Sequence, residues 1–308
     1  IIGVEPEDSA CLKAALEADE RVVLPQVGLF ADGVAVKQIG AEPFRLAREY
    51  VDDVITVTSD EICAAVKDIF EDTRAIAEPS GALALAGLKK YIGINGKGEK
   101  LGAILSGANV NFHSLRYVSE RCELGEQKEA ILAVKVPERP GIFLRFCELL
   151  EKRAMTEFNY RFSSRDKAVV FAGIRLSNGQ VELEEIIANL ESEGFGVQDL
   201  SQDETAKLHV RYMVGGQPPE PIEERLFSFE FPEHPGALFK FLTTLQSKWN
   251  ISLFHYRNHG AAYGRVLAGF EVPECDSLRF QQFLTDLGFV YQEETQSPAY
   301  QLFLGHRD

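Results

Sequence analysis

The 308-residue chain contains the same run of motifs twice, and this duplication limits the folds that it can adopt. The matching segments are "ERPGIFLRF" (138–146) with "EHPGALFKF" (233–241), "EFNYRF" (157–162) with "LFHYRN" (253–258), and "VVFAGIRL" (169–176) with "RVLAGFEV" (265–272). The spacing is regular, since the prolines lie 95 residues apart (235 − 140) and the tyrosines 96 (256 − 160). Two copies are too few for a solenoid, so the pattern indicates a duplicated domain.

Each copy predicts the same order of elements. A half-buried strand, "AILAVKV" (130–136) or "RLFSFEF" (225–231), precedes a helix that starts at Pro-Gly, and two strands, a helix and a short strand follow. The predicted order is therefore β-α-β-β-α-β, twice. Proline suits the first turn of a helix, and the glycine beside it lets a ligand approach the helix N-terminus. An ordinary strand-to-helix turn would explain one Pro-Gly pair, whereas two pairs in the same frame favour a small-molecule effector module.

The first 118 residues have a different pattern, in which short apolar strands alternate with helices. This pattern is typical of a parallel sheet that is covered on both faces. The expected strands are 1–5 and 53–57, and a third apolar strand within 101–110 runs into a polar, glycine-containing turn. The expected helices are 9–18, 59–70 with Ser59 or Asp60 as its cap, one that opens at Pro79, and a neck over about 112–126. The whole chain is thus expected to be α/β plus α+β.

Composition narrows the range of partners. The net charge of −15, with no local cluster of Lys and Arg, disfavours nucleic acid and anionic membrane surfaces as partners. No apolar run approaches the ~20 residues that span a bilayer. Five cysteines without a Cys-x-x-Cys pair are expected to be reduced and mostly buried, which favours a cytoplasmic protein.

Two motifs in the first third carry a resemblance to a known family. "EPSGALALAG" (78–87) and "LSGANVN" (105–111) resemble the fold-type II, pyridoxal-phosphate-dependent serine/threonine dehydratases, and the duplicated halves resemble ferredoxin-like ACT-like domains. Together they resemble the biosynthetic threonine dehydratases over all 308 residues. The resemblance implies the C-terminal part of a catalytic domain at 1–118, a neck at 119–127, and ACT-like regulatory domains at 128–216 and 217–308.

The resemblance also implies an activity and its control. Members convert L-threonine to 2-oxobutanoate and ammonia for isoleucine biosynthesis, with inhibition by isoleucine, relief by valine and assembly as a homotetramer. A rival hypothesis is a non-catalytic amino-acid sensor in which residues 1–118 dock to a partner. Threonine and serine both remain open as the preferred substrate.

Three residues match positions near the cofactor, pyridoxal 5'-phosphate. Ser106 matches a serine that donates a hydrogen bond to the pyridine nitrogen, and Gly33 and Glu78 match neighbours of the ring. A neutral hydroxyl leaves that nitrogen unprotonated, so the ring is a weaker electron sink and elimination is favoured over transamination. The alternatives are a turn serine for Ser106 and a carboxylate that stabilises a helix start for Glu78.

The sequence departs from the family pattern at two places. Cys11 stands where related serine racemases have a cation-ligating aspartate, and Glu5 alone is too little for a hard cation, so no metal is predicted. The family's cofactor-binding lysine and glycine-rich phosphate loop are expected upstream of a strand like "IIGVEP". We therefore expect the sequence to belong to a longer protein, to be inactive by itself, and to contain no catalytic residue.

The duplicated halves suggest where an effector binds. The resemblance implies that the matching residues Tyr160 and Tyr256 contact isoleucine. Phe143 and Leu238 are equivalent positions on the two Pro-Gly helices, and Leu242 lies one turn along, so the three predict an apolar pocket. Ordinary core packing is the alternative for these three residues.

Overall fold

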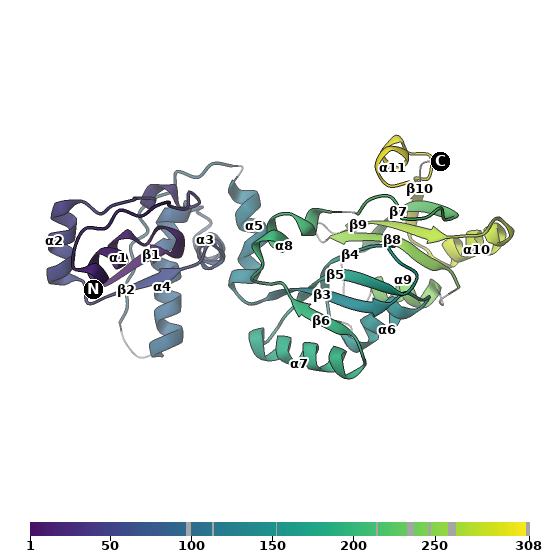
Figure 1. The fold of residues 1–308 in the computed structure, drawn as a ribbon, viewed down its shortest axis with the longest axis horizontal. Coiled ribbons are helices and arrows are strands. Elements are labelled where there is room, and N and C mark those ends of the chain that lie inside the picture. Colours follow the sequence, from purple (N-terminus) through teal and green to yellow (C-terminus); the bar gives the residue numbers. More distant parts are fainter. Residues whose placement is uncertain are drawn as a thin grey trace. The chain divides into compact units, whose positions relative to one another are not determined.

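The computed structural model describes residues 1–96, 100–112, 114–151, 153–213, 215–232, 237–245, 248–257 and 263–305. The chain divides into two compact units, residues 1–127 and 128–308, which are described separately. Figure 1 shows the elements of each unit.

The first unit contains two parallel strands and a set of helices. β1 (Ile2–Pro6) pairs with β2 (Asp53–Val57), so both strands lie where the apolar runs predict them. The helices are η1 (Glu7–Ser9), α1 (Cys11–Ala18), η2 (Asp32–Val34), α2 (Ala41–Tyr50), α3 (Ser59–Thr73), α4 (Pro79–Asn95) and α5 (Ser114–Gly125). Apolar side chains of β2, α3, α4 and α5 form the core of this unit.

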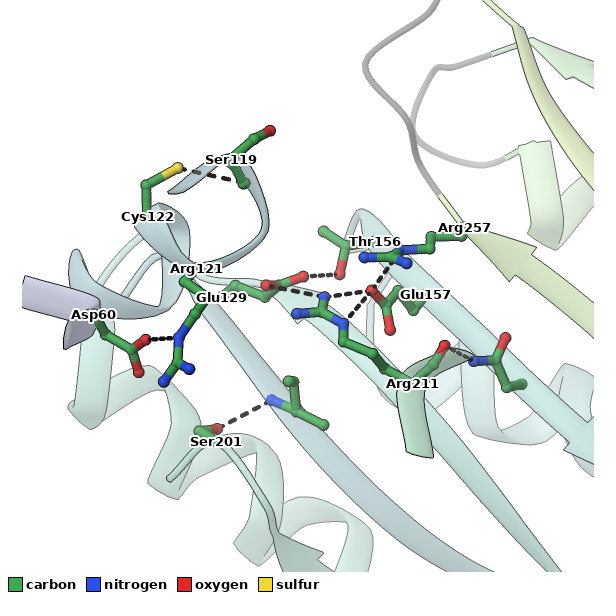
Figure 2. Close-up of polar contacts among 12 residues, drawn as sticks. Asp60, Ser119, Arg121, Cys122, Glu129, Thr156, Glu157, Ser201, Arg211 and Arg257 are labelled. Atoms are coloured by element: carbon green, nitrogen blue, oxygen red, sulfur yellow. Dashed lines mark hydrogen bonds and ion pairs between the residues drawn. The ribbon is translucent and has the colours of Figure 1, made fainter. Parts of the chain in front are cut away.

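The start of α3 differs from the prediction. Thr58 caps the helix: its hydroxyl accepts from the Glu61 N–H at 3.1 Å, and the Glu61 carboxylate accepts from the Thr58 N–H at 2.7 Å. This capping box satisfies two N–H groups at once, so neither Ser59 nor Asp60 is the cap. Asp60 instead forms a buried ion pair with Arg121 of α5, which Figure 2 shows.

The apolar strand that was expected within 101–110, before a polar turn, is not formed. Residues 100–112 have no regular strand, although the run "LGAIL" is apolar. An extended segment is stable only when its N–H and C=O groups pair with a neighbouring strand. None of the described residues supplies that neighbour, so apolar character alone was a misleading signal here.

The second unit confirms the duplicated β-α-β-β-α-β order. The first half contains β3 (Glu129–Pro137), α6 (Ile142–Leu149), β4 (Met155–Arg161), β5 (Lys167–Arg175), α7 (Gly179–Ser192) and β6 (Gly196–Asp199). The second half contains β7 (Glu224–Pro232), α9 (Ala237–Leu245), β8 (Asn250–Arg257), β9 (Tyr263–Glu271), η4 (Glu274–Asp276), α10 (Ser277–Leu287) and β10 (Val290–Glu293). The second Pro-Gly pair, at 235–236, lies outside the described residues.

The two halves share one eight-stranded sheet in the order β10-β7-β9-β8-β4-β5-β3-β6. Equivalent strands β4 and β8 pair antiparallel at the centre, with Phe158 opposite Tyr256 and Tyr160 opposite Phe254. Phe158 is equivalent to Phe254 in the repeat, and Tyr160 is equivalent to Tyr256, so a local twofold axis between β4 and β8 relates the two pairs. The halves are therefore bonded edge to edge, which removes an exposed edge strand from each of them.

Helices cover both faces of this sheet (Figure 1). The core between the sheet and helices α6, α7, α9 and α10 is rich in phenylalanine, including Phe158, Phe241, Phe254 and Phe270. Two short segments that the sequence did not predict, α8–η3 (Glu204–Leu208 and Val210–Tyr212) and α11 (Pro298–Phe303), contribute side chains to the other face. Each half thus ends with an extra helix that folds back onto the sheet.

Every helix in the part of the chain that the structure describes is too short or too polar to span a lipid bilayer.

The cysteines are free, as expected, and four of the five are buried. Burial raises the pKa of the Cys122 thiol to about 11 and that of Cys147 to about 12, with Glu123 and Glu148 adding to the respective shifts.

Only a thiolate reacts quickly with iodoacetamide, so at about pH 8 we expect one adduct per native chain, at exposed Cys275. Mass spectrometry of the native and urea-unfolded chain measures this. Rapid labelling of Cys147 in the native chain would contradict the burial.

Candidate functional site

The first turn of α4 is packed against the loop that contains Ser106. The N–H of Glu78 donates to the carbonyl of Gly107 at 3.1 Å. A Cβ on Gly107 would collide with the Glu78 carboxylate, and one on Gly81 would collide with the Gly107 backbone. Gly81 is therefore required for this close approach to the Gly107 backbone, whereas a side chain at 107 would displace the flexible Glu78 carboxylate.

The same helix turn carries a buried hydroxyl. Ser80 is 8% exposed, and its Oγ has no hydrogen-bond partner among the described residues. A Cβ on Gly33 would lie 2.9 Å from this Oγ. No side chain in the described part of the chain caps α4, so its first N–H groups and the Ser80 hydroxyl together form a polar surface that fits an anionic or hydrogen-bonding small molecule.

The three residues expected near a cofactor thus come together around this turn. Glu78 is the residue before the helix, Gly33 lies against Ser80, and Ser106 precedes Gly107 in the adjoining loop. Ser106 is exposed and belongs to a loop instead of a strand end. Sequence reasoning missed Ser80, whose only local signal is its place inside "EPSGA".

The other polar residues singled out at the N-terminal end have structural partners. The Glu5 carboxylate accepts from the N–H groups of Leu12 and Lys13 at 2.8 and 2.9 Å and so stabilises the start of α1. Cys11 is buried beside it, and burial followed by the Glu5 charge raises its thiol pKa. Among the described residues, no group of three His, Cys, Asp or Glu side chains is arranged to hold a metal ion.

In the second unit, a small pocket lies at the start of α6. Gly141 precedes this helix with a left-handed φ of 84°, and none of the described side chains caps the helix. The pocket is lined by Arg139, Pro140, Gly141, Phe143 and Leu144 of the first half and by Leu242, Leu245, Trp249, Asn250 and Ile251 of the second. Its volume is about 20 Å³, which is room for roughly one water molecule.

Two of the five predicted effector residues line this pocket, and Tyr160, Tyr256 and Leu238 do not. Phe143 and Leu242 line it, whereas Leu238 packs against the edge of the core. The Tyr160 hydroxyl donates to the Glu138 carboxylate at 2.6 Å, and burial followed by this hydrogen bond raises the tyrosine pKa. Tyr256 is 9% exposed and lies opposite Phe158 in the sheet.

Glu138, Trp249 and Asn250 were missed by the sequence reasoning. The Glu138 carboxylate accepts from the Asn250 amide at 3.0 Å as well as from Tyr160, so it joins the two halves beside the pocket. Glu138 opens the repeated motif "ERPG", which was the available signal. Trp249 and Asn250 break the repeat, so a search for matching residues could not find them.

The opposite face of the sheet carries two reciprocal ion pairs. Arg161 of β4 binds Glu224 of the second half, and its repeat Arg257 of β8 binds Glu157 of the first half at 3.1 Å. Figure 2 shows Arg257 and Arg211 approaching Glu157 from two sides. Burial alone would lower the pKa of the Arg211 guanidinium, but Glu157 raises it above its ordinary value. The arginine of each "F-x-Y-R" motif therefore holds the other half of the unit.

Comparison with known proteins identifies two families along the chain. Residues 1–107 match the family of pyridoxal-phosphate dependent enzymes, and residues 120–210 and 216–304 each match the C-terminal regulatory domain of threonine dehydratase. The second family accounts for more than half of the chain.

Several characterised proteins are similar over almost the whole chain. L-threonine dehydratase biosynthetic IlvA of Escherichia coli (strain K12) is 64% identical over 99% of this chain and 59% of that protein. The mitochondrial threonine dehydratase of Saccharomyces cerevisiae is 49% identical over 99% of this chain and 55% of that protein. A solved structure of processed threonine deaminase isoform 2 from Solanum lycopersicum is 42% identical, with a TM-score of 0.40 over 40% of this chain and 34% of that one. The chain therefore spans less than two thirds of the curated relatives.

Proposed function

The chain belongs to the threonine dehydratase family, and from this premise we propose that it is part of an enzyme that converts L-threonine to 2-oxobutanoate and ammonia in isoleucine biosynthesis. The match to the regulatory-domain family over 120–210 and 216–304, next to a pyridoxal-phosphate enzyme match over 1–107, is the observation that carries this proposal. In the proposed division, residues 1–118 belong to the catalytic domain, 119–127 form the neck, and 128–216 and 217–308 are the regulatory domains.

The residues around the start of α4 are proposed to hold one side of the cofactor. Pyridoxal phosphate, when bound, withdraws electrons from the substrate so that the Cα proton and the β-hydroxyl can leave. Ser106 donates its hydroxyl to the ring nitrogen, while Glu78 and Gly33 shape the neighbouring wall. The uncapped helix start and the unpartnered Ser80 hydroxyl support this assignment, because both leave hydrogen-bonding capacity for a bound group.

Substitution of the serine tests the cofactor assignment. In the full-length protein, Ser106→Ala should weaken cofactor binding by roughly 1 to 3 kcal/mol, because the ring nitrogen loses its donor. Cofactor affinity is measured by the change in absorbance on titration, and turnover is measured beside it. Ser119→Ala, an exposed serine of α5, is the control. Unchanged cofactor affinity in Ser106→Ala would reject the assignment.

The second unit is proposed to bind isoleucine as an inhibitor and valine as an antagonist, within a cytoplasmic homotetramer. The pocket at the start of α6, with the apolar residues Phe143 and Leu242 and the polar pair Tyr160 and Glu138, supports an amino-acid effector. Isoleucine and valine differ by one methylene, worth about 1 kcal/mol of discrimination. Opposite effects of the two amino acids therefore require that they favour different arrangements of the halves.

Isoleucine titration tests this regulatory role without any catalysis. Calorimetry on the 308-residue chain should give saturable binding, and Tyr160→Ala or Tyr256→Ala should weaken it. Tyr160→Ala removes a ring that contacts Phe143, with centroids 4.8 Å apart, and leaves Glu138 without one donor. Binding that is unaffected by both substitutions would move the effector site elsewhere.

A further inference from the structure

One residue that lines the pocket at the start of α6 has a buried donor without an acceptor among the described residues. Trp249 lines the pocket and is 4% exposed, and its indole nitrogen has no hydrogen-bond partner among the described residues. The ring itself is held firmly, since it packs against Phe280 and Phe283 with centroids 5.0 and 5.7 Å away. An unpartnered buried N–H costs free energy, so a retained one indicates a ligand that accepts from it.

Other groups at the same pocket complement an amino acid. The Ile142 N–H donates to the Arg139 carbonyl at 3.3 Å, but no side chain of the described residues caps α6. The N–H groups that follow in the first turn therefore favour a carboxylate, as does the Trp249 N–H. The Glu138 carboxylate, which is joined to the second half through Asn250, offers an acceptor for an ammonium group. The side chains of Leu242 and Leu245 supply the apolar wall that an aliphatic side chain needs.

The matching position in the other half lacks this arrangement. With the strand offset of 96, Arg153 is the counterpart of Trp249 (249 − 96), and Ala154 is the counterpart of Asn250 (250 − 96). The Arg153 guanidinium is already occupied, because it donates to Glu182 at 2.7 Å and to the Leu150 carbonyl at 3.1 Å. An alanine has no amide to offer. The residues at 153–154 and at 249–250 therefore offer different chemistry.

We propose that Trp249 donates its indole N–H to the carboxylate of the effector amino acid in the pocket at the start of α6. This inference rests on the proposed regulatory function and names a residue that recognises the effector.

The size of the pocket gives this site a regulatory consequence. At about 20 Å³ it holds roughly one water molecule, far less than an amino acid requires. Entry of the effector must separate the start of α6 from Leu242 and Leu245 of α9, which belong to different halves. Effector binding at Trp249 therefore selects an arrangement in which the two halves lie further apart at this point.

Isoleucine titration of Trp249→Phe tests the inference. The phenylalanine keeps an aromatic ring against Phe280 and Phe283 but removes the N–H. Loss of a buried hydrogen bond to a carboxylate should weaken isoleucine binding by about tenfold to a hundredfold. Arg153→Lys, at the counterpart position, is the matched control and should bind isoleucine as the unsubstituted chain does. Circular dichroism verifies that both variants are folded.

A second measurement does not depend on any substitution. Trp249 is the single tryptophan of the chain, so a nitrogen-15 labelled sample gives one indole N–H resonance. Isoleucine should shift this resonance and slow its exchange with solvent. An unshifted resonance, or equal affinities of Trp249→Phe and the unsubstituted chain, would overturn the role of Trp249 while leaving the regulatory function intact. Absence of isoleucine binding to the unsubstituted chain would instead overturn the regulatory function itself.

Discussion

Replacing Arg161 with methionine should lower the free energy of unfolding of the chain by about 3 to 5 kcal/mol. The Arg161 guanidinium binds the Glu224 carboxylate, whose side chain is only 2% exposed, and it also donates to the Leu304 carbonyl at 2.6 Å. Methionine fills a similar volume, but it leaves the buried Glu224 carboxylate without its positively charged partner. Urea unfolding followed by circular dichroism measures the loss, and the same variant should melt about 6 to 20 °C lower.

A surface arginine provides the comparison for this experiment. Arg145 pairs with Glu193 and Glu148 on the surface and has a side chain that is 46% exposed, so Arg145→Met should change stability by less than about 1 kcal/mol. The double variant Arg161→Met/Glu224→Leu should recover part of the loss, because it removes the unpaired carboxylate as well. Equal effects of Arg161→Met and Arg145→Met would show that the ion pair between the halves does not stabilise the unit.

Replacing Phe270 with alanine should cost about 3 to 5 kcal/mol, for a different reason. Phe270 of β9 is completely buried and its ring lies within 6.4 Å of the rings of Phe229, Phe241 and Phe280. The alanine leaves a cavity that these rigid rings cannot fill without leaving their rotamers. The measurement is again urea unfolding.

The duplicated sheet supplies matched controls for the cavity. Phe270→Leu removes less volume and should cost less than the alanine. Ile174, the counterpart in the first half (270 − 96), is also completely buried, and Ile174→Ala should cost about 2 to 5 kcal/mol. Phe303 is 71% exposed, so Phe303→Ala should have almost no effect. A small loss in Phe270→Ala would mean that the core can collapse around the cavity.

The sequence predicted the helices and strands of the second unit better than those of the first. Alternating apolar residues and Pro-Gly punctuation are local signals, so β3, β4 and α6 could be placed from them. The segment 101–110 failed because strand formation depends on a neighbour that no local pattern encodes. The prediction of Ser59 or Asp60 as the α3 cap was wrong for a smaller reason: three adjacent residues all have side chains that suit a cap, and the structure uses Thr58.

The candidate sites were predicted only in part. Phe143 and Leu242 could be assigned to a pocket because helical periodicity places them on one face. Tyr160 was noticed because it repeats, but its partner Glu138 was not foreseen, since a hydrogen bond across 22 residues leaves no periodic trace. Ser80 and Trp249 were missed because neither residue has a matching copy in the repeat. Their signal is a buried polar atom without a partner among the described residues, which only the structure shows.

By itself, the sequence determined that the C-terminal part is a duplicated β-α-β-β-α-β unit, because strand and helix periods and turn residues are properties of neighbouring positions. Only the tertiary structure decided that β4 pairs with β8. From this pairing follow the exchange of Arg161 and Arg257 between the halves and the position of Trp249 beside the start of α6. These are contacts between residues far apart in the chain, and they depend on burial and on edge-to-edge hydrogen bonding that no local pattern specifies.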